Sequence, residues 1–171
     1  MQEKPENNID VPMVRLSRFA VLPSYAHDHD AGMDIYSSED VLLMPGETKL
    51  IPTGLAAAIP EGFEAQIRPR SGISLKTMLR IPNSPGTIDA GYRDQICVIM
   101  HNASFLPSGR EDLPPLTLEE KNNRHGAYLI RRGDKIAQMV FAGISHAVLT
   151  EVPTLEGIGA DRQGGFGSTG I

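Results

Sequence analysis

Short segments rich in branched apolar residues alternate with glycine and proline along most of the chain. The sequence has 17 glycines and 13 prolines, and these residues separate the apolar segments from one another. Many short strands with turn residues between them are typical of a β sandwich, jelly roll or barrel. We therefore predict an all-β domain with strands at residues 41–44, 49–51, 65–67, 96–100, 127–130, 136–142 and 147–152.

Helical signals are few by comparison. Residues 74–79 follow a glycine and fit one or two helical turns, and Thr117 and Glu120 form a capping box behind two prolines. No internal repeat or linker divides the 171 residues, and this length suits one domain with its own core. We therefore expect short helical turns within a single β domain.

Composition and charge limit the classes of function. With 40% hydrophobic and 22% charged residues, the chain has the composition of a globular protein, and no apolar run is long enough to cross a bilayer. The net charge of −5 argues against non-specific binding of nucleic acid, whose phosphates require a basic surface. Cys97 is the single cysteine and residues 1–10 lack a signal-peptide pattern, so we expect a cytoplasmic protein with no membrane segment.

The chain ends in a glycine-rich segment whose chemistry suits a phosphate ligand. Glycines between 164 and 170 let the backbone approach a ligand closely, and Ser168 and Thr169 add hydroxyl groups. Arg162 supplies a planar cation that pairs well with phosphate oxygens, and Phe166 supplies one ring that can stack on a base. We interpret residues 160–171 as a mobile lid that closes over a nucleotide.

Two further segments carry polar chemistry between apolar strands. Residues 68–72, Arg-Pro-Arg-Ser-Gly, place guanidinium, hydroxyl and backbone N–H groups together, which favours an anion site. Residues 83–94 contain Asp-Ala-Gly, an ordinary hairpin turn, followed by Tyr92 and Arg93, which turn chemistry alone does not require. Residues 31–36 and 131–141 complete the set, and Gln138 in the latter is a polar side chain within a buried strand that needs a partner.

These five segments together resemble the homotrimeric dUTPase family, the deoxyuridine triphosphate nucleotidohydrolases, in motif identity and in order. The resemblance runs from about Ala31 to Gly170 and is most specific at residues 86–93 and 164–170. It implies a jelly-roll-like β barrel and a homotrimer with active sites at subunit junctions. It also implies hydrolysis of dUTP to dUMP and pyrophosphate by Mg²⁺-assisted water attack on the α-phosphate, which limits uracil in DNA.

The same resemblance implies a role for each motif residue. Asp89 is the expected catalytic base, and Asp34 is expected to contact Mg²⁺ through water. The residues expected to bind the phosphates are Arg70, Ser71, Gly72, Gln138, Arg162, Ser168 and Thr169. Those expected to bind uracil and deoxyribose are Asn83, Asp89, Tyr92, Ile96, Cys97 and Phe166.

Two departures from the family pattern leave alternatives open. Asp94-Gln95 follows the Tyr-Arg pair where the family commonly has Gly-Glu, and residues 101–126 are longer than the expected connection. We interpret 101–126 as a surface insertion in a domain spanning 1–159, with a protein-binding, regulatory role as an alternative. A dCTP deaminase-like or bifunctional relative is the other alternative.

Overall fold

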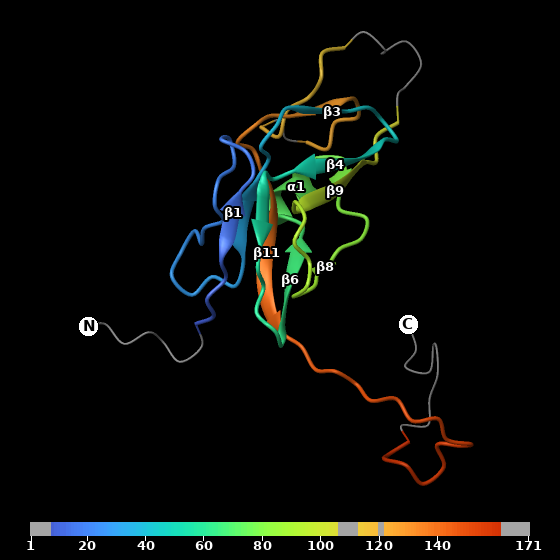
Figure 1. Ribbon diagram of the computed structural model, residues 1–171. Coiled ribbons are helices and arrows are strands. Elements are labelled where there is room, and N and C mark those ends of the chain that lie inside the picture. Colours follow the sequence, from blue (N-terminus) through green and yellow to red (C-terminus); the bar gives the residue numbers. More distant parts are fainter. Residues whose placement is uncertain (1–7, 106–112, 120–121, 162–171) are drawn as a thin grey trace.

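The computed structural model describes residues 8–105, 113–119 and 122–161, and these residues form an almost entirely β structure. The prediction of an all-β protein is therefore confirmed (Figure 1). The strands are β1 (Met13–Arg15), β2 (Met33–Tyr36), β3 (Val41–Leu43), β4 (Thr48–Pro52), β5 (Leu55–Ala57), β6 (Phe63–Arg68), β7 (Leu79–Arg80), β8 (Gly86–Ile88), β9 (Cys97–Asn102), β10 (Tyr128–Ile130) and β11 (Lys135–Gly143). One short helix, α1 (Ser71–Lys76), follows β6.

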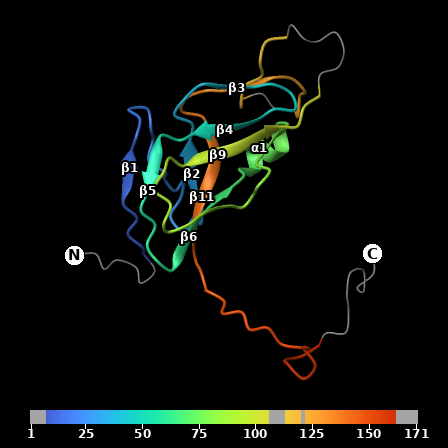
Figure 2. The same ribbon diagram turned by 45° about the vertical axis from the view of Figure 1, so that its right-hand side comes forward.

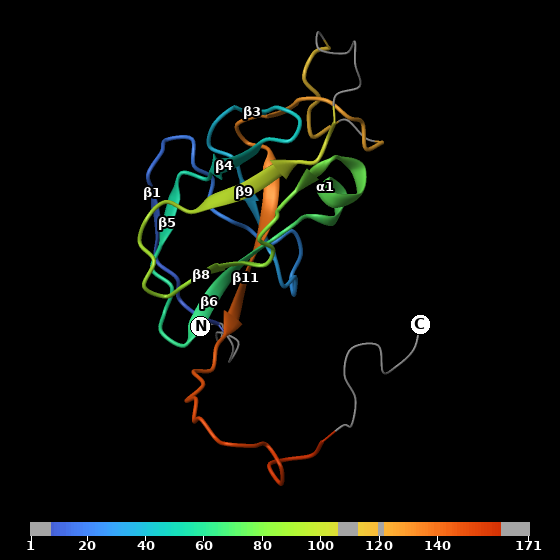
Figure 3. The ribbon, with the colours of Figure 1, turned by 90° about the vertical axis from the view of Figure 1, so that its right-hand side faces the viewer.

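The strands pair in small antiparallel sheets. The largest sheet has the order β2-β11-β6-β8, and a second has the order β4-β9-β7. Figures 2 and 3 show β4 and β9 crossing one end of the long strands β6 and β11. The pairs β1-β5 and β10-β3 complete the structure. Paired strands are not neighbours in the sequence, so the chain crosses repeatedly between the sheets, and the two larger sheets enclose the apolar interior between them.

The core follows the two-residue period of the strands. In β9 the side chains of Val98, Met100 and Asn102 are buried, while the alternating residues Cys97, Ile99 and His101 are half-buried. This alternation is the expected pattern for a strand with one face on the core. Fully buried branched and aromatic side chains from the other strands meet β9 there, among them Ile35, Leu43, Ile51, Ile67, Tyr128 and Ile136.

The prediction of a strand at residues 147–152 is wrong. This segment has no strand partner among the described residues, and Val148 and Leu149 are 93% and 91% exposed. After β11 the chain leaves the sheets and runs away from them (Figure 1). Branched residues favour a strand only where a neighbouring strand supplies hydrogen bonds, and no described part of the chain does so here.

The helix begins earlier than expected, at Ser71 instead of residue 74. The carbonyl of Arg70 accepts hydrogen bonds from the N–H groups of Ile73 and Ser74, which starts the first turn before the glycine. The helix ends at Thr77, whose side-chain hydroxyl and backbone N–H both donate to the Ile73 carbonyl. Within the described ranges, no helix has the length and apolar character needed to span a membrane.

The described part of the 101–126 insertion is joined to the body of the protein. Leu116 is 6% exposed and belongs to the core, and Asn123 donates hydrogen bonds to the carbonyls of Leu75 and Lys76 in α1. At Leu116 and Asn123 the insertion therefore packs against the core and α1. The capping box expected with Thr117 involves Glu120, which lies outside the described residues.

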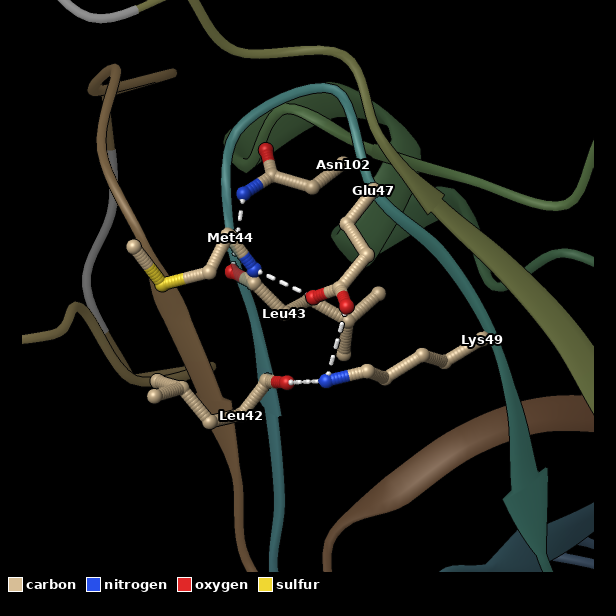
Figure 4. Close-up of polar contacts among 6 residues, drawn as sticks. All are labelled: Leu42, Leu43, Met44, Glu47, Lys49 and Asn102. Atoms are coloured by element: carbon tan, nitrogen blue, oxygen red, sulfur yellow. Dashed lines mark hydrogen bonds and ion pairs between the residues drawn. The ribbon is translucent and has the colours of Figure 1, made fainter.

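Asn102 fixes the point where the insertion leaves β9. Its side-chain amide donates to the carbonyls of Leu43 and Gly126, and its carbonyl oxygen accepts from the Ser104 N–H at 3.0 Å. Figure 4 shows the first of these bonds beside the turn between β3 and β4. Asn102 is fully buried, and its side chain makes three hydrogen bonds, as a buried amide requires.

Candidate active site

A pocket of about 350 Å³ lies beside the loop that leads from β8 into β9. Residues expected to bind uracil and deoxyribose line it together: Asn83, Asp89, Tyr92, Ile96 and Cys97. Leu50, Ile67 and Ile99 add apolar surface, so the pocket offers an apolar wall with polar groups at its rim. Such a lining suits a flat ring with hydrogen-bonding edges.

The loop of residues 89–95, between β8 and β9, is closed by its own hydrogen bonds. The Tyr92 N–H donates to the Asp89 carbonyl at 3.0 Å, and the Tyr92 hydroxyl donates to the Gln95 carbonyl at 2.9 Å. The Arg93 guanidinium donates to the carbonyls of Ala90 and Tyr92. These bonds leave the Asp89 carboxyl group exposed at the rim of the pocket.

The floor of the pocket is a fixed piece of backbone around Ile96. Its N–H donates to the Leu55 carbonyl at 2.8 Å, and its carbonyl accepts from the Thr53 hydroxyl at 2.7 Å. Ile96 itself is 1% exposed. At the adjacent Cys97, burial, with a smaller contribution from the Glu39 charge, raises the pKa of the thiol, so this thiol is protonated at neutral pH.

Gly86 shapes the pocket wall opposite the loop. A Cβ atom at this position would lie 3.0 Å from the Asn83 side-chain nitrogen and 3.5 Å from the Ile67 Cβ. The glycine therefore lets the Asn83 amide fold back against β8. Sequence reasoning placed Gly86 in the motif but assigned it no part in forming the pocket.

A second polar group centres on Asp34 in β2. This side chain is 5% exposed, and its two oxygens lie 3.0 Å from Arg70 Nε and 2.8 Å from Lys135 Nζ. Burial is the largest single influence on the Asp34 pKa and raises it, but the hydrogen bonds and charges of Lys135 and Arg70 together lower the pKa below its ordinary value of 3.8. Asp34 is therefore ionised at neutral pH, and it holds both cations in place.

Gln138 and the start of α1 flank this carboxylate. Gln138 in β11 pairs with Asp34 on one side and with Arg68 on the other. Its side chain packs over Gly32, where an added Cβ would lie 3.3 Å from the Gln138 Cβ. Ser71 and Gly72 are exposed at the beginning of α1. The residues expected in the closing tail, Arg162, Phe166, Ser168 and Thr169, lie outside the described residues.

The strand register separates the two polar groups within one chain. In the register of the sheet, Asp34 lies opposite Gln138, which in turn lies opposite Arg68. Ile88 lies opposite Ala65, so the next residue, Asp89, lies opposite Glu64. The interval between Arg68 and Glu64 spans about 13 Å along the strands, and the three strand spacings from β2 to β8 add about 14 Å across them. Asp34 and Asp89 of the same chain therefore lie on the order of 20 Å apart.

Sequence reasoning missed two residues that make specific contacts at these sites. Lys135 is the second cation on Asp34, and Gln95 lines the pocket and accepts a hydrogen bond from the Gly54 N–H. A lysine after a Gly-Asp turn looks solvated in the sequence, and nothing local relates residue 95 to residue 54. Both contacts depend on strand register, which short motifs do not reveal.

Comparison with known proteins identifies the family. The dUTPase family model matches residues 19–105. A deoxyuridine 5′-triphosphate nucleotidohydrolase of Solibacter usitatus is 46% identical over 156 residues, covering 88% of this chain and 89% of that protein. Its counterpart in Clostridium tetani is 44% identical, covering 91% of this chain and 92% of that protein.

Solved structures agree with the sequence relatives. The dUTPase of Staphylococcus bacteriophage 80alpha, in complex with dUPNHPP, has a TM-score of 0.82 at 32% identity and covers 96% of this chain and 100% of that one. The dUTPase from phage phi11 of S. aureus has a TM-score of 0.79 at 34% identity, covering 87% and 99%. The expected jelly-roll fold is thus confirmed, and the deaminase alternative is not favoured. By sequence, fold and motif order, the chain belongs to the dUTPase family.

Proposed function

We propose that this protein hydrolyses dUTP to dUMP and pyrophosphate, with Asp89 as the base that activates the attacking water. The observation that carries the proposal is the pocket in which Asp89 lies at the rim, with Asn83, Tyr92, Ile96 and Cys97 around it. An exposed carboxylate next to a pocket that fits a base and sugar can accept a proton from water at the α-phosphate. Family membership supports the same reaction.

Recognition of the base and sugar follows from the pocket's walls. Backbone groups of the strand near Ile96 and Cys97 read the uracil edge, and the Asn83 side chain adds a contact. The Tyr92 ring lies against the deoxyribose and fills the space that a ribose 2′-hydroxyl needs. Rejecting a substrate in this way is efficient because a misplaced hydroxyl or amino group leaves buried polar groups without partners.

The phosphates bind at the second polar group, to Arg70, Ser71, Gly72 and Gln138. Mg²⁺ bound to the triphosphate neutralises charge there. The described residues contain no group of three or more His, Cys, Asp or Glu side chains able to hold a metal alone. One carboxylate, Asp34, suits a cation that keeps its waters, and each of its oxygens can accept a further hydrogen bond beside those from Arg70 and Lys135.

The active sites are shared between subunits of a homotrimer. The support for this proposal is the separation of Asp34 and Asp89, on the order of 20 Å within one chain. A base must lie within hydrogen-bond reach of the water it activates, and the same triphosphate must reach the phosphate-binding residues. One nucleotide therefore uses Asp89 from one subunit and Arg70 from another. Residues 160–171 of a further subunit close over it, with Arg162, Ser168 and Thr169 on the phosphates and Phe166 on the uracil.

The base assignment is tested by the Asp89→Asn variant. An amide cannot take a proton from water, so turnover should fall by about a hundredfold to ten-thousandfold while folding and dUTP affinity are retained. Asp94→Asn is the matched control, because Asp94 is exposed in the same loop but does not line the pocket. Turnover of Asp89→Asn within a few-fold of the parent would exclude Asp89 as the base.

The substrate is tested by a screen of dUTP, dCTP, dTTP and UTP that separates pyrophosphate, phosphate and ammonia. Pyrophosphate should form from dUTP far faster than from the other nucleotides, and ammonia release from dCTP would favour the deaminase instead. Shared sites are tested by refolding Asp89→Asn and Arg70→Ala chains together. The mixture should regain activity that neither variant has, since some sites then carry neither substitution; no recovery would place each site within one chain.

A further inference from the structure

The loop of residues 89–95 carries two residues of the proposed site, and most of its hydrogen bonds are internal. The Tyr92 N–H and hydroxyl bond to the carbonyls of Asp89 and Gln95, and Arg93 bonds to the carbonyls of Ala90 and Tyr92. A loop closed in this way keeps its own shape. Its orientation toward the pocket must be set by a contact with another part of the protein.

That contact is made by the Gln95 side chain. Among the hydrogen bonds of the described residues, the one that joins 89–95 to a distant part of the chain runs from the Gly54 N–H to Gln95 Oε1, at 3.0 Å. Gly54 is buried, so without Gln95 this N–H would have no partner and no water. Breaking this hydrogen bond would leave a buried N–H unsatisfied, so we expect the bond to persist.

Gly54 is itself immobile, which makes it an effective anchor. Its φ of +69° lies in the left-handed region, and an added Cβ would lie 2.9 Å from the Ser17 Cβ and 3.0 Å from the Ala20 Cβ. Its carbonyl accepts a hydrogen bond from the Leu16 N–H at 2.7 Å. The turn between β4 and β5 is thus held from both sides, and the loop is attached to a rigid point.

We propose that Gln95 is a positioning residue that orients the 89–95 loop, and thereby sets the preference for deoxyribose over ribose. The inference rests on the proposed dUTP hydrolysis, because it assigns Tyr92 to the sugar. The Tyr92 hydroxyl donates to the carbonyl of Gln95 itself, so the ring that limits the sugar space and the side chain that anchors the loop belong to one hydrogen-bonded unit.

The floor of the pocket does not depend on this anchor. Ile96 is held by the Leu55 carbonyl, the Thr53 N–H and the Thr53 hydroxyl, none of which involves the Gln95 side chain. Loss of the Gln95 oxygen therefore frees the loop while the uracil-binding backbone stays in place. Discrimination between sugars should change more than the ability to bind a uracil nucleotide.

The experiment compares three substitutions at residue 95 with one control. Gln95→Met removes the acceptor at similar volume, Gln95→Asn keeps the amide but is too short to reach, and Gln95→Glu keeps an oxygen acceptor at the same distance. Thr48→Val is the control, because it removes a hydrogen bond of 2.9 Å to His101 between β4 and β9 outside the pocket. For each protein, kcat and KM are measured with dUTP and with UTP, together with the melting temperature.

Gln95→Met and Gln95→Asn should each lower the dUTP-to-UTP ratio of kcat/KM by about tenfold, while Gln95→Glu should stay within about threefold of the parent. Thr48→Val should leave the ratio unchanged whatever it does to the melting temperature. An unchanged ratio in both the Met and Asn variants, or an equal loss in Gln95→Glu, would overturn the inference alone. A parent protein that fails to hydrolyse dUTP would overturn the proposed function and the inference together.

Discussion

Replacing Asp34 by asparagine tests whether the buried carboxylate holds the phosphate-binding cations in place. Asparagine keeps the shape and one acceptor oxygen but loses the charge that binds Arg70 at 3.0 Å and Lys135 at 2.8 Å. Hydrogen bonds to charged groups contribute about 1.5–3 kcal/mol each, but both cations are partly exposed and regain water when the charge is lost. We therefore expect Asp34→Asn to lower the free energy of unfolding by about 2 kcal/mol.

For a chain of this length, such a loss corresponds to a fall of about 4–8 °C in the melting temperature, measured by thermal denaturation at fixed protein concentration. Glu47→Gln is the matched control. Glu47 pairs with Lys49 at 2.9 Å and accepts from the Met44 N–H, but its side chain is 33% exposed (Figure 4). Equal melting temperatures for Asp34→Asn and Glu47→Gln would refute the reasoning, because burial of the carboxylate would then make no difference.

The effect of Asp34→Asn should also depend on pH. The folded-state pKa of Asp34 is lowered from 3.8, so the carboxylate stabilises the protein fully at pH values above that ordinary value. This contribution is lost as the pH falls below 3.8 through the folded-state pKa. The difference in melting temperature between parent and variant should thus be constant near neutral pH and shrink in acid. A difference that grows in acid would contradict the assigned direction of the pKa shift.

Two further predictions concern the insertion and the tail. Asn102→Leu should destabilise the protein by about 4 kcal/mol in urea denaturation, because it removes the hydrogen bonds of the amide to the buried Leu43 and Ser104 backbone groups and to the half-buried Gly126 carbonyl; a loss near zero would mean that water replaces the amide. Deleting residues 160–171 should leave the melting temperature near that of the parent but slow dUTP turnover, in line with a lid that acts only on the bound nucleotide; full activity would exclude the lid.

The sequence indicated the base and sugar pocket well because its residues lie close together in the chain. Asn83, Asp89 and Tyr92 lie within about ten residues of one another, just before and just after the short strand β8, so the chain itself keeps them close. The resemblance to the dUTPases also implied the jelly-roll fold that carries them. In this part of the chain, the residues that form the pocket are close in the sequence as well as in space.

Contacts that depend on long-range register could not be predicted. Gln95 meets Gly54, and Lys135 meets Asp34, only because of how separate strands align. The segment 147–152 shows the opposite error, since its branched residues favour a strand but no neighbouring strand is present among the described residues. The helix start at Ser71 was missed because glycine is a weak helix former, so Gly72 was read as lying outside the helix.

The way the insertion is attached has a consequence for protein engineering. Asn102 ties the first residues after β9 to Gly126, while Leu116 and Asn123 hold the second half of the insertion against the core and α1. Closing a longer loop costs only about 0.6 kcal/mol for each doubling of its length. A reporter peptide grafted between Phe105 and Leu113 would therefore be tolerated, whereas exchanging all of residues 101–126 for the connection of a shorter relative would open the core at Leu116.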